Sequence, residues 1–144
     1  MKPFLDTSVL VATFYGDHEH HEPSLTLFLR QKKQTAYAAA HSLVEVYSVL
    51  TGMPGKHRAT ADEALLFLSD VRERLTLVTL DEKEYFGVLK SAAATGISGE
   101  AVYDALIARC ALKGKADVIY TWNTKHFNRP GMELASRVRT PEDD

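Results

Sequence analysis

The sequence predicts an α/β fold in which helices cover both faces of a central, mainly parallel sheet. Short apolar or β-branched runs typical of strands alternate with segments of helical periodicity along the 144 residues. Such alternation favours parallel strands joined by right-handed crossovers. In an open sheet of this kind the binding crevice lies outside the carboxyl ends of the strands, so we expect the functional residues there.

The expected elements are a strand at 3–5, a helix through 9–12, a helix at 23–31, a strand at 35–38, a helix at 43–52, a helix through 64–68, a strand at 75–80, a helix towards 94, a helix at 100–113, a strand at 117–121 and a short strand near 138. Local signals support the helix ends. Thr60 and Glu63 have the spacing of a capping box. Ser98 is expected to cap the helix at 100–113, and Gly114 to end it.

The composition indicates a globular protein and excludes several other classes. Hydrophobic residues make up 45% and charged residues 25% of the chain, which argues against disorder. The formal net charge of −2 does not indicate a nucleic-acid binder, although a local basic patch can still form. The single cysteine permits no intramolecular disulfide. No apolar run reaches the roughly 20 residues of a membrane span. The N-terminal segment already contains an acid at Asp6, which interrupts the apolar core that a signal peptide would need. We therefore expect a soluble cytoplasmic protein without a signal peptide or a membrane partner.

Four polar residues are expected at or near the crevice. Asp6 and Asn123 follow predicted strands, whereas Glu45 and Asp104 lie within apolar helical segments. Asp104 shares its helix face with alanines, which predicts close packing against the sheet. A carboxylate turned towards the core is unfavourable unless it is paired or binds a cation. Three carboxylates and an amide oxygen are hard ligands without sulfur, a set that suits Mg²⁺ or Mn²⁺.

Each acid also has an ordinary structural interpretation. Asp6 could cap the helix that follows it, and Glu45 could lie on a solvated helix flank or in a salt bridge. For Asp104 the small-residue face leaves little room for a partner side chain. The sequence offers no Ser-His-Asp set and no glycine loop for phosphate, so a metal-assisted reaction is the economical interpretation.

Four segments resemble the signature blocks of the PIN-domain nucleases, at residues 6–11, 45–50, 103–108 and 116–127. Their order and spacing, and the length of the chain, resemble those of the VapC toxins of prokaryotic toxin–antitoxin pairs. The resemblance extends over essentially the whole chain. We therefore predict a single PIN domain over 1–141 and a short acidic C-terminal tail over 142–144.

The resemblance implies a PIN-like three-layer α/β/α sandwich that acts as a Mg²⁺-dependent endoribonuclease, hydrolysing RNA with a metal-activated water. It also implies a cognate VapB-like antitoxin that blocks the active site, and a homodimer. Asp6, Glu45 and Asp104 match the family's metal-binding acids. Asn123 matches the fourth catalytic position, where many members have Asp. The missing charge puts a second metal ion in doubt.

Further residues gain expected roles from the same resemblance. Thr7 or Ser8, together with Thr121, would hydrogen-bond to the metal ligands. Lys125 and His126 could contact the substrate phosphate or belong to a solvated loop. The resemblance does not support His126 as a general base.

A histidine-rich segment at 17–22 is a second candidate metal site, because His18 and His21 would face one way on a helix. We favour a solvated loop that leads into a helix starting near Pro23.

Two other functions compete with the nuclease. A PIN-like RNA-binding or scaffold domain without cleavage activity is the alternative, and Asn123 is the feature in its favour. A haloacid-dehalogenase-like phosphatase would need a second Asp where this chain has Ser8, so we reject it.

The sequence does not distinguish DNA from RNA as the substrate, because a metal site would meet the same phosphodiester group in both. When the three acids are set aside the chain is no longer net acidic, so RNA affinity is expected to come from the metal and a few basic groups.

Overall fold

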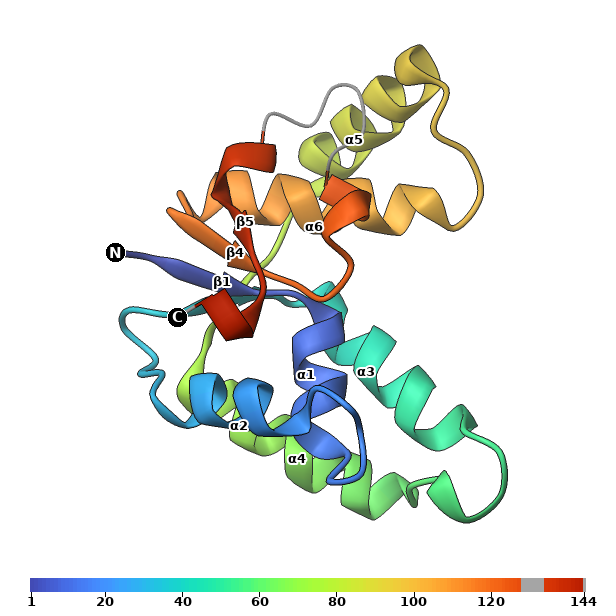
Figure 1. The fold of residues 1–144 in the computed structure, drawn as a ribbon. Coiled ribbons are helices and arrows are strands. Elements are labelled where there is room, and N and C mark those ends of the chain that lie inside the picture. The colour runs from blue at the N-terminus through green and yellow to red at the C-terminus, as the bar shows by residue number, and fades with distance from the viewer. Residues whose placement is uncertain (128–133, 144) are drawn as a thin grey trace.

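A parallel sheet of five strands forms the centre of the fold, in the order β3-β2-β1-β4-β5 (Figure 1). The computed structural model describes residues 1–127 and 134–143. The strands are β1 (Pro3–Leu5), β2 (Tyr37–Ala39), β3 (Thr76–Val78), β4 (Val118–Tyr120) and β5 (Val138–Arg139). Every strand pair is parallel, which confirms the predicted sheet.

Helices cover both faces of this sheet and complete three layers, as predicted. They are α1 (Thr7–Phe14), α2 (His21–Leu29), α3 (His41–Gly52), α4 (Ala61–Arg74), α5 (Glu82–Thr95) and α6 (Ala101–Lys113). Successive strand side chains point to opposite faces. Leu5 and Tyr120 therefore pack against α1 to α4, whereas Phe4 and Ile119 pack against α5 and α6.

The register of the two central strands brings the candidate site together. Leu5 of β1 is paired with Tyr120 of β4, so the residues that follow them leave the sheet side by side. The backbone N–H of Asp6 extends the ladder by donating to the Tyr120 carbonyl at 2.9 Å. Asp6 and Thr121 consequently lie at the carboxyl edge, where the α/β rule places a binding crevice.

The local helix signals were partly right. The Thr60–Glu63 capping box forms in both directions, at 3.1 and 2.8 Å, and α4 begins directly after it. The prediction that Ser98 caps the next helix was wrong. Helix α6 begins at Ala101, and Glu100 precedes it without a side-chain capping bond.

Gly114 ends α6, but not through the left-handed conformation that such a glycine usually supplies. Its φ is −75°, and Lys115 is the residue with a positive φ of 57°. A Cβ at Gly114 would lie 3.2 Å from the Val78 Cγ2 atom. Glycine is therefore favoured here by the close approach of the end of α6 to β3.

Several element boundaries differ from the prediction by one or more residues, among them those of β2 and α2. The strand expected at 35–38 is Tyr37–Ala39, because the N–H groups of Thr35 and Ala36 both donate to the Lys32 carbonyl in a turn. Helix α2 starts at His21 rather than near Pro23.

The end of the described chain folds back onto the domain. Pro141–Asp143 forms a short 3-10 helix in which Pro141 is buried. The division into a domain at 1–141 and a tail at 142–144 stays a prediction, and Asp144 lies outside the described residues. Among the residues that the structure describes, no helix is long and apolar enough to cross a membrane.

Candidate active site

A cleft of about 670 Å³ opens at the carboxyl edge of the sheet, between α1, α3 and α6. It is lined by most of the residues predicted from the sequence: Asp6, Thr7, Ser8, Glu45, Asp104, Asn123 and His126. Thr121 is fully buried beside Asp6, whereas Lys125 is exposed and is not part of the lining. Residues from distant parts of the chain thus meet at the predicted edge.

Asp6 is the most deeply buried of the acids, with 7% of its surface exposed. It precedes α1 but makes no side-chain capping hydrogen bond to it, so the structure gives no support to the capping interpretation. Burial raises the pKa of Asp6 above its usual value, and the nearby charge of Asp104 adds to this effect. Hydrogen bonds from Thr121, Ser8 and the Thr7 backbone lower the pKa without cancelling the rise.

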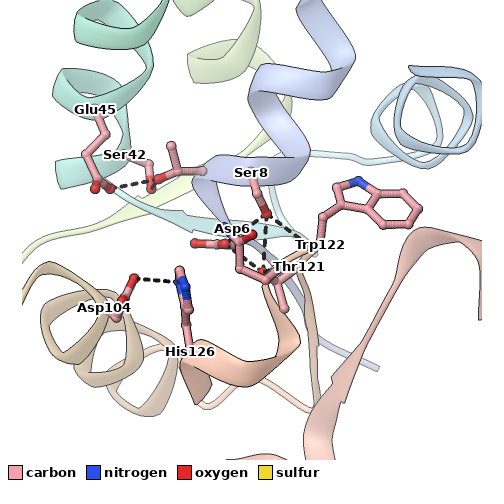
Figure 2. Close-up of polar contacts among 10 residues, drawn as sticks. Asp6, Ser8, Ser42, Glu45, Asp104, Thr121, Trp122 and His126 are labelled. Carbon is pink, nitrogen blue, oxygen red and sulfur yellow. Dashed lines mark hydrogen bonds and ion pairs between the residues drawn. The ribbon is translucent and has the colours of Figure 1, made fainter. Parts of the chain in front are cut away.

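Two hydroxyl groups hold one oxygen of Asp6. Thr121 Oγ1 donates to Asp6 Oδ2 at 2.7 Å, and Ser8 Oγ donates to the same atom at 3.0 Å (Figure 2). Each hydroxyl has a single hydrogen, so its own oxygen then serves as an acceptor. Ser8 accepts from the Trp122 backbone N–H and Thr121 from that of Asn123, both at 3.0 Å. The second oxygen of Asp6 points towards the space between Glu45 and Asp104 (Figure 2).

Glu45 projects from α3 and is held by Thr7, the first residue of α1. The Thr7 hydroxyl donates to Glu45 Oε1 at 2.8 Å and lies 2.9 Å from Ser42 Oγ. The half-buried position of Glu45 raises its pKa, and the charges of Asp6 and Asp104 raise it further. The hydrogen bond from Thr7 lowers the pKa but does not cancel the rise. Asp6, Glu45 and Asp104 thus line one cleft together.

Ser42 is a site residue that the sequence analysis missed. It is 1% exposed and lies one helical turn before Glu45 on the same face of α3. The spacing of three residues between Ser42 and Glu45 could have suggested that both lie on the site face of α3. It indicates a role for Ser42 only once the structure shows that Thr7 contacts both side chains.

The small-residue face around Asp104 on α6 was expected to leave little room for a partner side chain. The structure contradicts this expectation, because Asp104 does have a partner. His126 Nδ1 lies 3.3 Å from Asp104 Oδ1, forming an ion pair when the imidazole is protonated (Figure 2). The Asp104 side chain is 26% exposed because it faces the open cleft. The 3-10 turn Thr124–Phe127, which follows β4, brings His126 to it.

The histidine-rich segment is a loop up to His20 with Asp17 and Glu19 exposed, as favoured, and part of it also lines the cleft. His18, Glu19 and His20 all contribute to the lining, and the His20 ring is stacked on Trp122. His21 instead places its Nδ1 atom 3.0 Å from the Ala12 carbonyl oxygen. The structure therefore gives no support to the alternative of a metal site at His18 and His21.

The donor set of the cleft fits a hard divalent cation. Asp6, Glu45 and Asp104 offer carboxylate oxygens, and the buried Asp6 has an oxygen directed into the shared space. No group of three or more His, Cys, Asp or Glu side chains in the described chain is already arranged to hold a metal ion. Mg²⁺ needs no such closed cage, because it commonly keeps several waters and binds through one or two carboxylates.

The sequence pattern that defines the PIN domain matches residues 4–131. The chain belongs to the PIN-domain family. A relative of this PIN domain is ribonuclease VapC40 of Mycobacterium tuberculosis, which is 35% identical over 114 residues, covering 79% of this chain and 81% of the relative. The chain is thus a homologue of the VapC ribonucleases, as the resemblance implied.

Solved structures show the same fold. The VapC20 toxin of Mycobacterium tuberculosis, described as cleaving the sarcin–ricin loop, has a TM-score of 0.70 at 13% identity, covering 87% of this PIN domain and 92% of that chain. A toxin–antitoxin complex from Klebsiella pneumoniae gives a TM-score of 0.64 at 17% identity, with 97% and 98% covered.

Proposed function

We propose that this PIN domain is a Mg²⁺-dependent endoribonuclease and the toxin of a VapBC-like pair in the cytoplasm, with Mn²⁺ as a possible substitute cation. The observation that carries the proposal is the convergence on one cleft of three carboxylates, one directly after β1, one on α3 and one on α6. Burial, and to a smaller extent the neighbouring carboxylates, raise the pKa values of Asp6 and Glu45, so their ionised forms are unfavourable without a counter-ion. Homology to a ribonuclease supports RNA as the substrate.

Asp6, Glu45 and Asp104 are the residues that would hold the cation. When bound, Mg²⁺ lowers the pKa of a coordinated water and shields the charge that develops at the phosphodiester. Ser8 and Thr121 fix one oxygen of Asp6, so the orientation of the other is set before the cation arrives. Thr7 does the same for Glu45.

We propose that Asn123 takes the fourth catalytic position. Its backbone N–H is anchored on Thr121, and its side chain lies in the lining of the cleft. An amide there would orient a water or a ligand carboxylate without adding charge. His126 lines the cleft and Lys125 is exposed on the same turn, so both are proposed to contact the RNA phosphate.

A homodimer and a VapB-like antitoxin complete the proposal. Its support is the likeness to a toxin–antitoxin complex and the apolar side chains that α3 and α4 expose, such as Val44, Leu65 and Leu66. Expression of the chain without its partner is expected to arrest growth, whereas expression of the Asp6→Ala variant is not. Growth arrest by both would contradict the assignment of Asp6.

Cleavage of single-stranded RNA tests the activity directly. The wild type is expected to cut in Mg²⁺ and to stop when EDTA is added, and the Asp6→Asn and Asp104→Asn variants are expected not to cut. The Asp70→Asn variant is the matched control, because Asp70 is an exposed acid on α4 outside the cleft. Cleavage that survives EDTA, or survives either cleft substitution, would refute the metal mechanism. RNA binding without cleavage would favour the scaffold function instead.

A further inference from the structure

We propose that the stacked rings of His20 and Trp122 form a platform on which an unpaired base of the RNA stacks beside the carboxylates. The proposal deepens the proposed function, because it assigns a nucleotide-binding subsite to the same cleft. It concerns how the substrate is held and gives neither residue a part in the hydrolysis.

The two rings are arranged as a flat pair. Their centroids lie 3.7 Å apart and their planes differ by 6°. His20 immediately precedes α2, and Trp122 follows β4, so the pair joins segments about a hundred positions apart in the sequence. Both side chains line the cleft that contains the acids.

Hydrogen bonds fix the tryptophan at both ends. Its backbone N–H donates to Ser8 Oγ at 3.0 Å, and its indole Nε1–H donates to Ser24 Oγ at 2.8 Å. Ser24 is fully buried, so the second bond anchors the ring to the core of the domain. A ring held in this way loses little freedom when a ligand stacks on the pair, which favours binding.

The imidazole is also held, yet it stays accessible. The His20 backbone N–H donates to His18 Nδ1 at 3.0 Å, and His20 Nε2 lies 3.5 Å from a Glu19 carboxylate oxygen. The His20 side chain is nevertheless 29% exposed. A stack that served only to tether the loop would not need to open onto the cleft.

The platform lies next to the candidate metal site without occupying it. Ser8 contacts both the Trp122 backbone and Asp6 Oδ2, so a single side chain links the acid to the residue that carries the indole. Figure 2 shows the indole directed away from Asp6 on the far side of Ser8. A phosphate at the carboxylates and a base on the rings would therefore belong to neighbouring parts of one strand. Proteins commonly bind unpaired bases by stacking them on aromatic side chains.

Trp122 supplies the probe for the test, since it is the only tryptophan in the chain. A short single-stranded oligoadenylate is titrated into the wild-type protein with Ca²⁺ in place of Mg²⁺, and tryptophan emission is recorded. Base stacking is expected to change the emission. An oligonucleotide with the same phosphates but abasic riboses is expected to bind about 5- to 150-fold more weakly and to leave the emission unchanged.

Variants locate the effect. His20→Ala is expected to weaken oligoadenylate binding within the same range, and His20→Phe to restore it, because a ring is kept. His57→Ala is the matched control, since it removes a half-exposed imidazole that does not line the cleft. If His20→Ala fails to fold by circular dichroism, the abasic comparison on the wild type decides the question alone.

The results separate this proposal from the nuclease. Equal affinity for the intact and abasic oligonucleotides, or no binding of either, overturns the platform even if the wild type cleaves RNA in Mg²⁺. Base-dependent binding that requires an aromatic residue at position 20 supports the platform even if no cleavage is found.

Discussion

Thr121 Oγ1 donates a 2.7 Å hydrogen bond to Asp6 Oδ2, joining residues 115 positions apart at the ends of the two central strands. Thr121 is fully buried, so its hydroxyl is shielded from bulk solvent. The bond therefore couples the parallel register of β1 and β4 to the orientation of the acid that projects farthest into the core.

Replacing Thr121 with valine tests this coupling, because valine keeps the shape and removes the hydroxyl. Asp6 would retain Ser8 as a donor but lose its shorter bond. We expect the Thr121→Val variant to bind Mg²⁺ about 10- to 100-fold more weakly, as measured by calorimetry and by the Mg²⁺ dependence of cleavage. Thr26→Val, on the exposed side of α2, is the control and should behave as the wild type. An unchanged Mg²⁺ affinity would show that the hydroxyl does not position Asp6.

The raised pKa values of Asp6 and Glu45 predict how stability depends on pH when metal is removed. Above their ordinary pKa values, 3.8 and 4.5, the folded state keeps protons that the unfolded state has lost. The free energy of unfolding therefore falls as the pH rises from these values through the raised ones. Mg²⁺ is expected to restore stability at neutral pH, because it binds the folded state.

Chemical denaturation over this pH range, in EDTA and in Mg²⁺, measures the effect. The Asp6→Asn variant should lose part of the pH dependence and most of the stabilisation by Mg²⁺. Asp70→Asn should lose neither. A metal-free wild type that becomes more stable as the pH rises through this window, relative to Asp6→Asn, would show that the sign is wrong.

Lys115 predicts a stabilising substitution away from the cleft. Its φ of 57° places a side chain in the left-handed region, which costs about 1–2 kcal/mol for a residue other than glycine. Lys115→Gly is expected to raise the free energy of unfolding by about 0.5–1 kcal/mol, since the greater freedom of glycine in the unfolded chain offsets part of the gain. Lys115→Ala is the matched control and should bring no such gain. Equal stability of both variants would indicate that the backbone conformation carries no strain.

The sequence predicted those features that depend on near neighbours or on the α/β rule. The capping box at Thr60 depends only on residues three positions apart, and Asp6 and Asn123 were expected at the carboxyl edge because each follows a strand. The same reasoning could not predict the partner of Asp104, since His126 reaches it from a turn on another segment.

The aromatic part of the cleft was missed for a related reason. The His20–Trp122 stack joins a loop before α2 to the residue after β4, and no periodicity relates the two. The histidine-rich segment was therefore interpreted as solvated, and Trp122 was seen only as part of a family signature. Pairings between distant loops need the tertiary structure, whereas the acids proposed to bind metal have a chemical signature in the sequence.

Asn123 offers the last test, because restoring an acid at this position would complete a set of four carboxylates. One more negative charge in the cleft should strengthen binding of a divalent cation by about 10-fold, because a dication and an exposed carboxylate about 5 Å apart attract by about 1–2 kcal/mol at the dielectric constant of water. The same charge adds repulsion when no cation is present, so the metal-free Asn123→Asp variant should be less stable than the wild type. Calorimetric Mg²⁺ titration and denaturation in EDTA measure the two effects. Gln34→Glu adds a charge on an exposed loop outside the cleft and should produce neither. If Asn123→Asp changes neither quantity, position 123 lies too far from the cation to belong to its site.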